Sequence, residues 1–598
     1  MRNLRTTGLV IFLGSFVLWL FTFWLEGYEL TDEVLSEIFD ETHLIEFQDV
    51  GKDILKKDYP TSFGLVSDLK LVFSHINESR LKDYSIQESQ IDQMVKLVGT
   101  SPLQFDKIQT LFDSTHVIEN YQFRTLRSWG SWLEAKSFSS EAEAKVAITG
   151  VVENIKRWGI INDLGYSTYT IDDLNYAIVK SSSAGPVSEN PEMFLILIYV
   201  MGSLGALMYL IPVLRLDGPQ GIKNNGIFNS VLTHRGWLGI LLGTFLIFFY
   251  ITLYFYPEYM TAWIIMVDPI SEFLKGQEAG RFFLYGFIYT LAILVMAVRM
   301  TIKYRHSKYQ IWRTISVTFF QLAFAFLIPE FLMRLNQPYF DFKNIWPLDY
   351  DFFFDYELDS MMQNGSIGLF MLGWGIGLII IGVPIFVYFF GKRWYCSWVC
   401  GCGGLAETVG DPFRQLSDKS LKAWKIERYS VHFVLLFAVV MTVGVLYTYW
   451  TGQDSILGVN TYTVRSIYGS WIGAGFAGVV GTGFYPLMGN RVWCRFGCPL
   501  AAYLGLIQWF KSRFRITTNG GQCISCGNCS TYCEMGIDVR WYAQRGENII
   551  RSSCVGCGVC SEVCPRGVLK LENRSDDNRF ISSGLVGNAS FPEIKKND

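Results

Sequence analysis

The chain has 598 residues, of which 50% are hydrophobic, 16% aromatic and only 18% charged. This composition is too apolar for a single soluble enzyme of this length and predicts a membrane protein. The net charge of -3 provides no basic surface, which argues against a nucleic-acid partner. All 13 cysteines lie after residue 395 in short, regularly spaced clusters, a distribution that excludes a disulfide scaffold and indicates metal binding.

Eight apolar stretches are long enough to cross a hydrocarbon core of about 30 Å, which takes about 20 helical residues. They cover residues 8–25, 193–214, 237–255, 282–298, 315–333, 367–390, 431–450 and 470–488. The first follows Arg2 and Arg5 and has no small-residue cleavage site, so residues 1–25 are expected to form an uncleaved anchor and not a signal peptide. The expected fold is therefore a mainly α-helical membrane protein with about eight transmembrane helices.

The charges of the predicted loops indicate an orientation. Loops 215–235, 299–314 and 391–430 hold 15 Lys and Arg, whereas the alternate loops 257–281, 334–366 and 451–468 hold 5. The positive-inside rule places the first group of loops in the cytoplasm. We therefore expect a multi-pass protein of the bacterial inner membrane, with both termini and every cysteine cytoplasmic and residues 26–192 outside.

Residues 26–192 are polar enough to form a soluble domain and carry helix-start signals. Ser101-Pro102 is typical of an N-cap and a first-turn proline, and Ser140 and Thr170 each begin a capping-box pattern. These signals predict a mostly helical extracytoplasmic domain. It contains no Cys-x-x-Cys-His motif, so no covalent haem is expected, and a docking or packing role is the simplest interpretation.

The predicted spans contain almost no ionisable side chains, and Glu330 is the clearest of them. Ion pumps place such groups deep in the membrane, so pumping by this chain alone is not expected. His234, His306 and His432 lie at cytoplasmic loops or helix ends without a bis-histidine partner, and we interpret them as interfacial residues and not as haem ligands.

Two consecutive four-cysteine runs near the carboxyl end carry the strongest signal. The first comprises Cys523, Cys526, Cys529 and Cys533, and the second comprises Cys554, Cys557, Cys560 and Cys564, followed by Pro565. In two-cluster ferredoxins with this spacing, three thiolates hold one iron–sulfur cluster and the fourth reaches the other cluster. The alternative is a pair of zinc knuckles.

Crossed ligation predicts one [4Fe-4S] cluster on Cys523, Cys526, Cys529 and Cys564, and a second on Cys554, Cys557, Cys560 and Cys533. Glycines 527, 556 and 558 would let the backbone approach the clusters closely. Glu534 stands where the bacterial ferredoxin pattern has proline, which would alter the local turn without removing a ligand. Residues 516–572 are the expected α+β ferredoxin-like domain, preceded by a seven-helix membrane domain, 193–515, and followed by a polar tail, 573–598.

The other five cysteines occur in two similar segments. Residues 391–401, with Cys396 and Cys400, align without gaps on residues 489–499, with Cys494 and Cys498, and each segment follows an inward-going span. Positions four apart share a helix face, so each pair could present two thiolates in one direction. We expect a third metal centre, an iron–sulfur cluster, at the cytoplasmic membrane edge.

Cys402 is the fifth thiol of this group, and it could replace one of the four ligands or stay free. A structural zinc site and unmetallated buried cysteines are the alternatives to an iron–sulfur cluster.

The paired Cys-x-x-x-Cys motifs, followed by a two-cluster ferredoxin module, resemble the membrane-bound polyferredoxins typified by the NosR and NapH proteins of nitrous-oxide and nitrate respiration. The resemblance covers roughly residues 230–570. The first pair departs from the family pattern because Cys400 is followed by Gly401 and Cys402 and not by proline. The outer domain has no Ser-Gly-Ala-Thr-like segment, so the covalent flavin of NosR-type proteins is not expected here.

The resemblance implies an electron-transfer membrane subunit that works between a cytoplasmic donor or the quinone pool and a partner redox enzyme. The alternative is an accessory factor that reduces a metal or cofactor during assembly of a respiratory enzyme, and a redox sensor is a weaker third possibility. No nucleophile–base motif, phosphate loop or nicotinamide fingerprint occurs, so no independent catalytic site is expected. Because every thiol is expected on one side of the membrane, the chain should work inside a larger redox assembly.

Overall fold

The structure, a computed structural model, describes residues 2–112, 116–217, 236–453, 455–456 and 458–573. The chain forms two compact units. Unit 1 contains Met1–Trp19, Glu192–Phe255 and Val267–Asp598, and unit 2 contains Leu20–Pro191 and Tyr256–Met266. The predicted polar tail beyond Asn573, and residues 218–235 of the predicted loop 215–235 with His234, lie outside the described residues.

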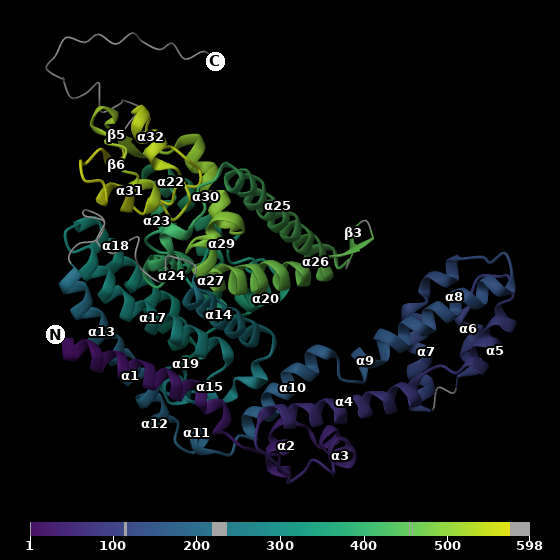
Figure 1. The fold of residues 1–598 in the computed structure, drawn as a ribbon. Coiled ribbons are helices and arrows are strands. Elements are labelled where there is room, and N and C mark those ends of the chain that lie inside the picture. Colours follow the sequence, from purple (N-terminus) through teal and green to yellow (C-terminus); the bar gives the residue numbers. More distant parts are fainter. Residues whose placement is uncertain (1, 113–115, 218–235, 454, 457, 574–598) are drawn as a thin grey trace. The chain divides into compact units, whose positions relative to one another are not determined.

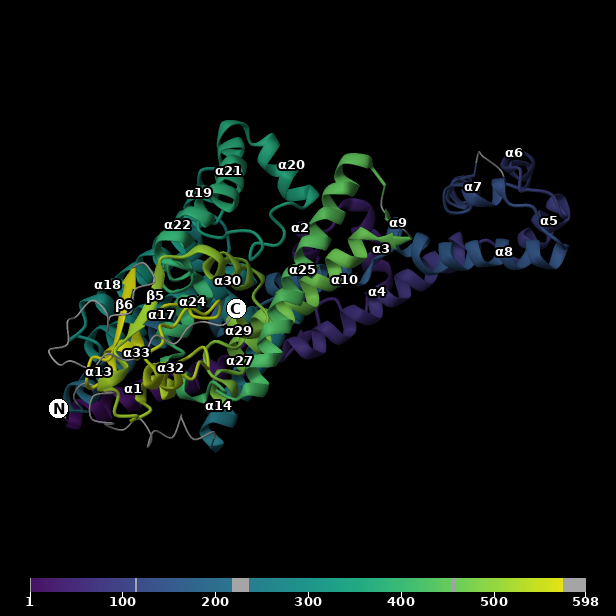
Figure 2. The same ribbon diagram turned by 90° about the horizontal axis from the view of Figure 1, so that it is seen from above.

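Unit 2 is mostly helical and has two hydrophobic cores. One core joins the strand pair β1 (Tyr28–Glu29) and β2 (Asp58–Tyr59) to α2 (Asp32–Ile38), α3 (Glu41–Val50), the first half of α4 (Ser62–Tyr84) and α10 (Thr168–Ser181). The other joins α5 (Glu88–Val98), α6 (Phe105–Ile108), α7 (Val117–Trp129) and α8 (Glu141–Asn154). Figures 1 and 2 both show α4 beside α10.

The predicted helix starts in this unit are partly right. Ser140 caps α8 by accepting a hydrogen bond from the backbone N–H of Glu143. The cap of α10 is Ser167 and not Thr170, whose backbone N–H donates to the Ser167 hydroxyl. The predicted start at Ser101-Pro102 is wrong, because the chain there is extended and the next helix begins at Phe105.

Among the described residues, seven helical stretches are long and apolar enough to cross a membrane. They are Arg2–Trp24, Pro191–Arg215, Trp237–Phe255, Arg281–Lys303, Lys308–Arg334, Gly365–Phe390 and Leu421–Thr451. All seven coincide with predicted spans, and several extend further into the flanking polar sequence. The chain is therefore a multi-pass membrane protein by its candidate spans.

The eighth predicted span, 470–488, is not among these seven stretches. Its residues fall in a helical run made of α26 (Thr461–Ile467), the π-helical η11 (Tyr468–Val480) and α27 (Gly481–Gly483), followed by the short helix α28 (Tyr485–Met488). A break at Phe484 separates the run from α28. The run packs along α25 (Leu421–Thr451), and the Thr448 and Thr461 hydroxyls are hydrogen-bonded at 2.7 Å.

The amino-terminal helix α1 (Arg2–Phe21) packs closely on α13 (Met201–Asp217) within unit 1. A Cβ added at Gly8 would lie 2.7 Å from the Gly205 carbonyl oxygen, and one added at Gly205 would lie 2.7 Å from the Phe12 nitrogen. Glycine is required at both positions because the two backbones are nearly in contact. The expectation that residues 1–25 form an uncleaved anchor stays a prediction.

The carboxyl-terminal module lies at one end of unit 1 (Figure 1), next to α18 (Lys308–Phe319) and α30 (Pro499–Lys511). Its two-stranded antiparallel sheet pairs β5 (Phe514–Thr518) with β6 (Leu569–Asn573), so its described ends nearly match the predicted domain, 516–572. Between the strands lie α31 (Asn528–Thr531), α32 (Val539–Arg545) and α33 (Val559–Glu562). The sheet brings the two ends of the module together around the cysteine loops.

Candidate metal centres

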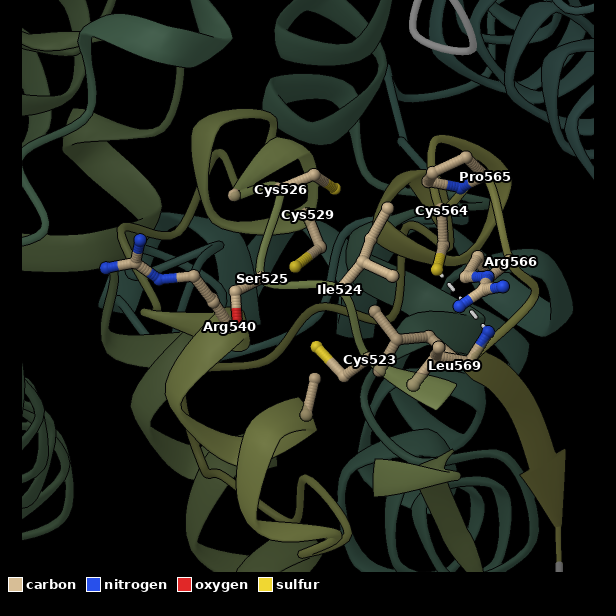
Figure 3. A pocket seen from close by; sticks show the side chains of 13 residues that line it. Cys523, Ile524, Ser525, Cys526, Cys529, Arg540, Cys564, Pro565, Arg566 and Leu569 are labelled. Carbon is tan, nitrogen blue, oxygen red and sulfur yellow. Dashed lines mark hydrogen bonds between the residues drawn. The ribbon is translucent and has the colours of Figure 1, made fainter. Parts of the chain in front are cut away.

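The structure gathers Cys523, Cys526, Cys529 and Cys564 around one small cavity, here called the outer cavity (Figure 3). The first three thiols belong to the first run and Cys564 belongs to the second. Cys526 is exposed, and the exposed side chains of Arg540 and Arg566 also line this cavity. The outer cavity is therefore the more solvent-accessible of the two cavities in the module.

A second cavity, here called the inner cavity, is lined by Cys554, Cys557, Cys560 and Cys533. Helix α18 is hydrogen-bonded to the loop that lines this cavity. The Tyr309 hydroxyl donates to the Gly556 carbonyl at 2.9 Å, and Arg313 donates to the Cys557 carbonyl at 2.7 Å. The module is thus fixed to the helical bundle on the side of the inner cavity.

These two sets of four are the crossed sets expected from the sequence. The loops that carry them use left-handed backbone at Gly527, Gly556 and Gly558, which have φ values of 82°, 63° and 78°. The backbone N–H groups of Ile537 and Val568 point at the Cys533 and Cys564 sulfurs, both at 3.4 Å. The two halves of the module therefore repeat one local geometry, which suits thiolate ligands. The ligand assignment itself stays a prediction.

The remaining cysteines form one buried group, here called the five-thiol group: Cys396, Cys400, Cys402, Cys494 and Cys498. The expectation that each pair lies on one helix is wrong. Cys396 ends the short helix α23 (Arg393–Cys396) and Cys400 caps the next helix, α24 (Gly401–Thr408). Cys494 lies within the short helix α29 (Val492–Phe496), and Cys498 caps the next helix, α30.

Each pair straddles a tight turn, and the two turns are alike. The Cys400 N–H donates to the Tyr395 carbonyl at 2.8 Å, and the Cys498 N–H donates to the Trp493 carbonyl at 2.9 Å. A four-residue spacing can bring two thiols together through such a turn as well as through a helix, and spacing alone does not distinguish the two.

A glycine with positive φ precedes each turn at the same repeat position. Gly391 has φ 66° and Gly489 has φ 93°. A Cβ at Gly391 would lie 2.6 Å from the Gln508 side-chain oxygen, and one at Gly489 would lie 2.3 Å from the Ser417 hydroxyl. Both glycines are therefore required by backbone conformation and by close contact.

The cysteine turns of the five-thiol group are held between the helices of the bundle. The Gln321 side chain donates to the Val399 carbonyl at 2.7 Å, and the Tyr289 hydroxyl donates to the Gly401 carbonyl at 2.6 Å. Gln321 is 13 residues from each end of Lys308–Arg334, about 20 Å at 1.5 Å per residue. The cysteine turns therefore insert between the helices of the bundle, and the expected place of the centre at the cytoplasmic membrane edge stays a prediction.

Cys402 is hydrogen-bonded to Cys400 within this group. Its hydrogen bond to Cys400 lowers the pKa of Cys400 to about 6 against the opposing effect of burial. Burial raises the pKa of Cys396 to about 12. Metal ligation requires deprotonated thiols, so a bound cationic cluster would supply the charge that stabilises them here.

A segment from the opposite end of the spans also reaches the five-thiol group. Ile345 belongs to the same buried core as four of the five cysteines, and Trp346 packs against it. The Lys343 side chain is buried nearby and is paired with Asp341 at 2.6 Å. The loop after α19 (Ile328–Arg334) thus returns into the bundle, which the hydropathy pattern did not indicate.

Sequence reasoning also missed a buried ion network between the inner cavity and the five-thiol group. Glu407 contacts Arg313 at 2.8 Å, Arg491 at 2.7 Å and Arg414. Arg414 also contacts Asp411 at 2.8 Å and Glu534 at 2.7 Å. All six side chains, here called the ion network, are at most 6% exposed.

The ion network contacts a sulfur of each neighbouring centre. Arg414 lies 3.9 Å from the Cys557 sulfur, and Arg491 lies 3.7 Å from the Cys494 sulfur. Arg299 and Lys303 add two cations, each 2.6 Å from Asp411. Burial by itself would raise the pKa of Glu407, but Arg313, Arg414 and Arg491 outweigh it and hold the pKa at about 2.

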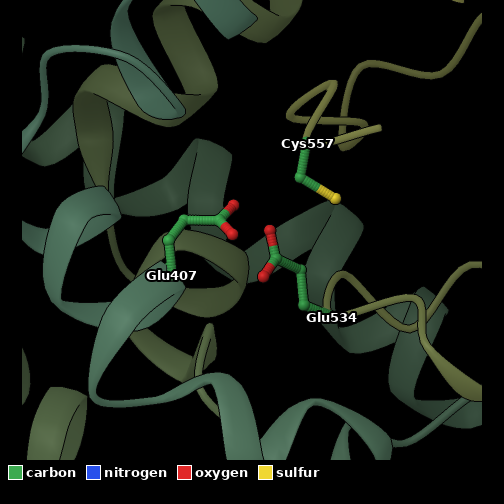
Figure 4. Close-up of side chains that lie close together, drawn as sticks. All are labelled: Glu407, Glu534 and Cys557. Atoms are coloured by element: carbon green, nitrogen blue, oxygen red, sulfur yellow. The ribbon is translucent and has the colours of Figure 1, made fainter. Parts of the chain in front are cut away.

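Glu534 was the signal in the sequence that could have revealed this network. It occupies the usual proline position, and the structure buries it between Arg414 and Arg491. Figure 4 shows its carboxylate facing Glu407, with Cys557 close by. The arginines already compensate the two carboxylates, so the trio resembles an ion network more than a separate metal site.

A large cavity of about 1130 Å³ lies beside these centres, between the first turns of α25, α30 and the module. Cys494 forms part of its wall, and Ser553, next to Cys554, forms another part. Its other walls combine tryptophans, cationic side chains and one imidazole: Trp424, Trp509, Trp541, Lys392, Arg428, Arg551 and His432. This mixture is typical of the membrane–water boundary.

Comparisons with known proteins agree with these cysteine groups. A family described as "4Fe-4S binding domain" matches the chain twice, at residues 374–420 and 471–517. A second, described as "4Fe-4S dicluster domain", matches residues 515–565. The double match agrees with the repeat of the cysteine segments that the sequence indicated.

One curated relative is the "Putative electron transport protein YccM" of Escherichia coli (strain K12), which is 26% identical over 156 residues. The match covers 25% of this chain and 43% of that protein. No solved structure matches the chain significantly.

Together, the family matches and the donor sets establish a membrane protein whose cysteine motifs bind [4Fe-4S] clusters. Such a cluster takes up and releases electrons one at a time. The closer assignment to proteins of the NosR and NapH type stays a prediction.

Proposed function

We propose that this chain is a membrane-bound electron-transfer protein with three metal centres in series. The observation that carries this proposal is the arrangement of its thiols in three groups at increasing depth. The outer cavity includes an exposed cysteine, the inner cavity adjoins the bundle, and the five-thiol group lies between the helices of the bundle. The name of the matched relative, which refers to electron transport, agrees with this role.

The residues assigned to the three centres are those expected from the sequence. Two [4Fe-4S] clusters are assigned to the outer and inner cavities, and a third to Cys396, Cys400, Cys494 and Cys498, with Cys402 as a possible substitute ligand. The chain's own part is to hold the thiols and exclude water from the two deeper centres. The proposal also includes an electron donor, an electron acceptor and other subunits of a larger redox assembly.

The alternative function is that of an assembly factor that reduces a metal or cofactor during maturation of a respiratory enzyme. Co-purification distinguishes the electron carrier from the assembly factor. An electron carrier should co-purify stoichiometrically with its partner enzyme, whereas an assembly factor should be missing from the mature complex.

We also propose that residues 461–488 cross the membrane as the eighth span. The family match at 471–517 repeats the match at 374–420, whose first part belongs to the candidate span Gly365–Phe390. The run starts beside Thr448, near one end of α25, whereas Arg495 contacts Glu427 at 2.6 Å near the other end. Eight crossings, together with the loop charges, support cytoplasmic termini and residues 26–192 outside the bacterial inner membrane.

A labelling experiment tests this orientation. Val117 is 76% exposed in unit 2, and Val117→Cys should react with a membrane-impermeant maleimide added outside intact inner-membrane spheroplasts. The matched control is Lys422→Cys, at the exposed start of α25, which should react only after permeabilisation. The reverse pattern would reject the orientation.

The large cavity beside Cys494 is the place where we propose that a quinone headgroup binds. It adjoins two centres, and His432 and Lys392 offer polar contacts to a carbonyl or hydroxyl group within aromatic walls. About 20 Å of helix separates Gln321, beside the five-thiol group, from the far end of Lys308–Arg334, and the chain has no assigned centre along that distance among its described residues. A partner or a quinone would have to complete that part of the path.

Sealed vesicles test the proposed route. With a reductant on the side of the ferredoxin module, the purified chain should reduce an impermeant acceptor on the other side only after a partner or quinone is added. His432→Leu should weaken the effect of quinone while leaving direct reduction of the centres by dithionite unchanged. Rapid transfer by the quinone-free chain would contradict this proposal and imply another internal cofactor.

A further inference from the structure

The ion network lies where charge would affect two centres at once. It connects Arg414, near the Cys557 sulfur, to Arg491, near the Cys494 sulfur, through the shared carboxylates of Glu407 and Glu534. Arg313 joins it from α18 and also donates to the Cys557 carbonyl. The network is therefore a continuous set of charged contacts between the inner cavity and the five-thiol group.

Positive charge exceeds negative charge in this region. Including Arg299 and Lys303, five cations face three carboxylates, which leaves two positive charges uncompensated when all eight groups are ionised. Seven of the eight side chains are at most 6% exposed, and Arg299 is 11% exposed, so water screens them poorly.

The outer cavity has a different electrostatic environment. Its nearby cations, Arg540 and Arg566, are exposed, and none of the described acidic side chains lines it. Exposed charges are strongly screened, so these two arginines should affect a bound cluster much less than buried ones would.

From these observations we infer that the ion network raises the reduction potentials of the inner-cavity centre and the five-thiol centre above that of the outer-cavity centre. Reduction adds one negative charge, and a buried positive excess stabilises the reduced form. Electron transfer from the outer-cavity centre to the inner-cavity centre and the five-thiol centre would then be favourable, so the network would set the direction of electron transfer. This inference rests on the proposed function and treats the network side chains as positioning residues that act on the centres through charge.

Charge-changing variants with opposite expected signs test the inference on the purified full chain. Arg414→Gln should lower the midpoint potential of the inner-cavity centre, and Glu407→Gln should raise it. We expect each equilibrium to change about tenfold, which is about 59 mV for a one-electron couple. The measurement is a redox titration followed by electron paramagnetic resonance, with iron content determined for every variant. The matched control, Arg566→Gln, removes an exposed charge at the outer cavity and should leave the inner-cavity potential unchanged.

Shifts of the same sign in Arg414→Gln and Glu407→Gln, or no shift at normal iron content, would overturn the inference. If Arg414→Gln loses iron, the nearly isosteric Glu407→Gln decides the sign alone. An inner-cavity potential in the wild type below that of the outer-cavity centre would also overturn it. Absence of cluster signals from the wild type would instead refute the proposed function, so the two failures are distinguishable.

Discussion

Replacing Cys564 by alanine is expected to remove the outer-cavity cluster and to leave the inner-cavity cluster largely intact. Cys564 belongs to the second cysteine run, yet its side chain lines the cavity of Cys523, Cys526 and Cys529. Loss of one of four thiolates should destabilise that cluster and remove about four iron atoms per chain. Iron analysis and electron paramagnetic resonance of the reduced protein measure the result.

The matched variant is Cys533→Ala, which changes the equivalent position of the first run. It should damage the inner-cavity centre and spare the outer one. If each substitution instead destroyed only the cluster of its own run, the crossed assignment would be wrong.

Replacing Cys498 by serine is expected to abolish the third centre. The Cys498 side chain is 6% exposed and packs with Cys396, Cys400 and Cys494 in one core. Water therefore has little access to replace the lost thiolate as a ligand. About four iron atoms per chain should be lost, while both clusters of the ferredoxin module keep their signals.

Cys402→Ser is the matched control because Cys402 belongs to the same group but has no counterpart in the repeat. It should retain the third centre. Loss of that centre in Cys402→Ser, together with its survival in Cys400→Ser, would show that Cys402 is the ligand in place of Cys400.

Local spacing was sufficient to predict the ferredoxin module. Eight cysteines within 42 residues leave few ways to arrange two clusters, and the structure gathers the two expected sets around separate cavities. The seven candidate spans were equally predictable, because a long apolar run in a membrane protein has few possible structures other than a membrane-spanning helix.

The packing of the five-thiol group between helices of the bundle could not be predicted from the sequence. It depends on contacts of Gln321 and Tyr289 with the cysteine turns, and these partners lie 78 and 112 residues away along the chain. The i, i+4 pattern also misled the helix assignment, because Cys400 and Cys498 are caps of new helices and not members of the preceding ones.

The ion network escaped prediction for a similar reason. Arg414 and Glu534 are 120 residues apart, and each alone is an ordinary charged residue in a predicted cytoplasmic segment. Only Glu534, at a position where the bacterial ferredoxin pattern has proline, pointed to the network in the sequence. Its partners could be identified only from the packing of the module on the bundle. Compensating charges from separate segments leave no periodic pattern in a single sequence.

Iron and acid-labile sulfide quantification on the purified wild-type chain, with electron paramagnetic resonance of the reduced protein, tests the central claim most directly. Three centres of four iron atoms each predict about twelve iron atoms and about twelve sulfides per chain, with signals from three distinguishable clusters. A reproducible value near eight, with no zinc and only two cluster signals, would contradict the third centre and with it the proposed series of sites leading into the membrane.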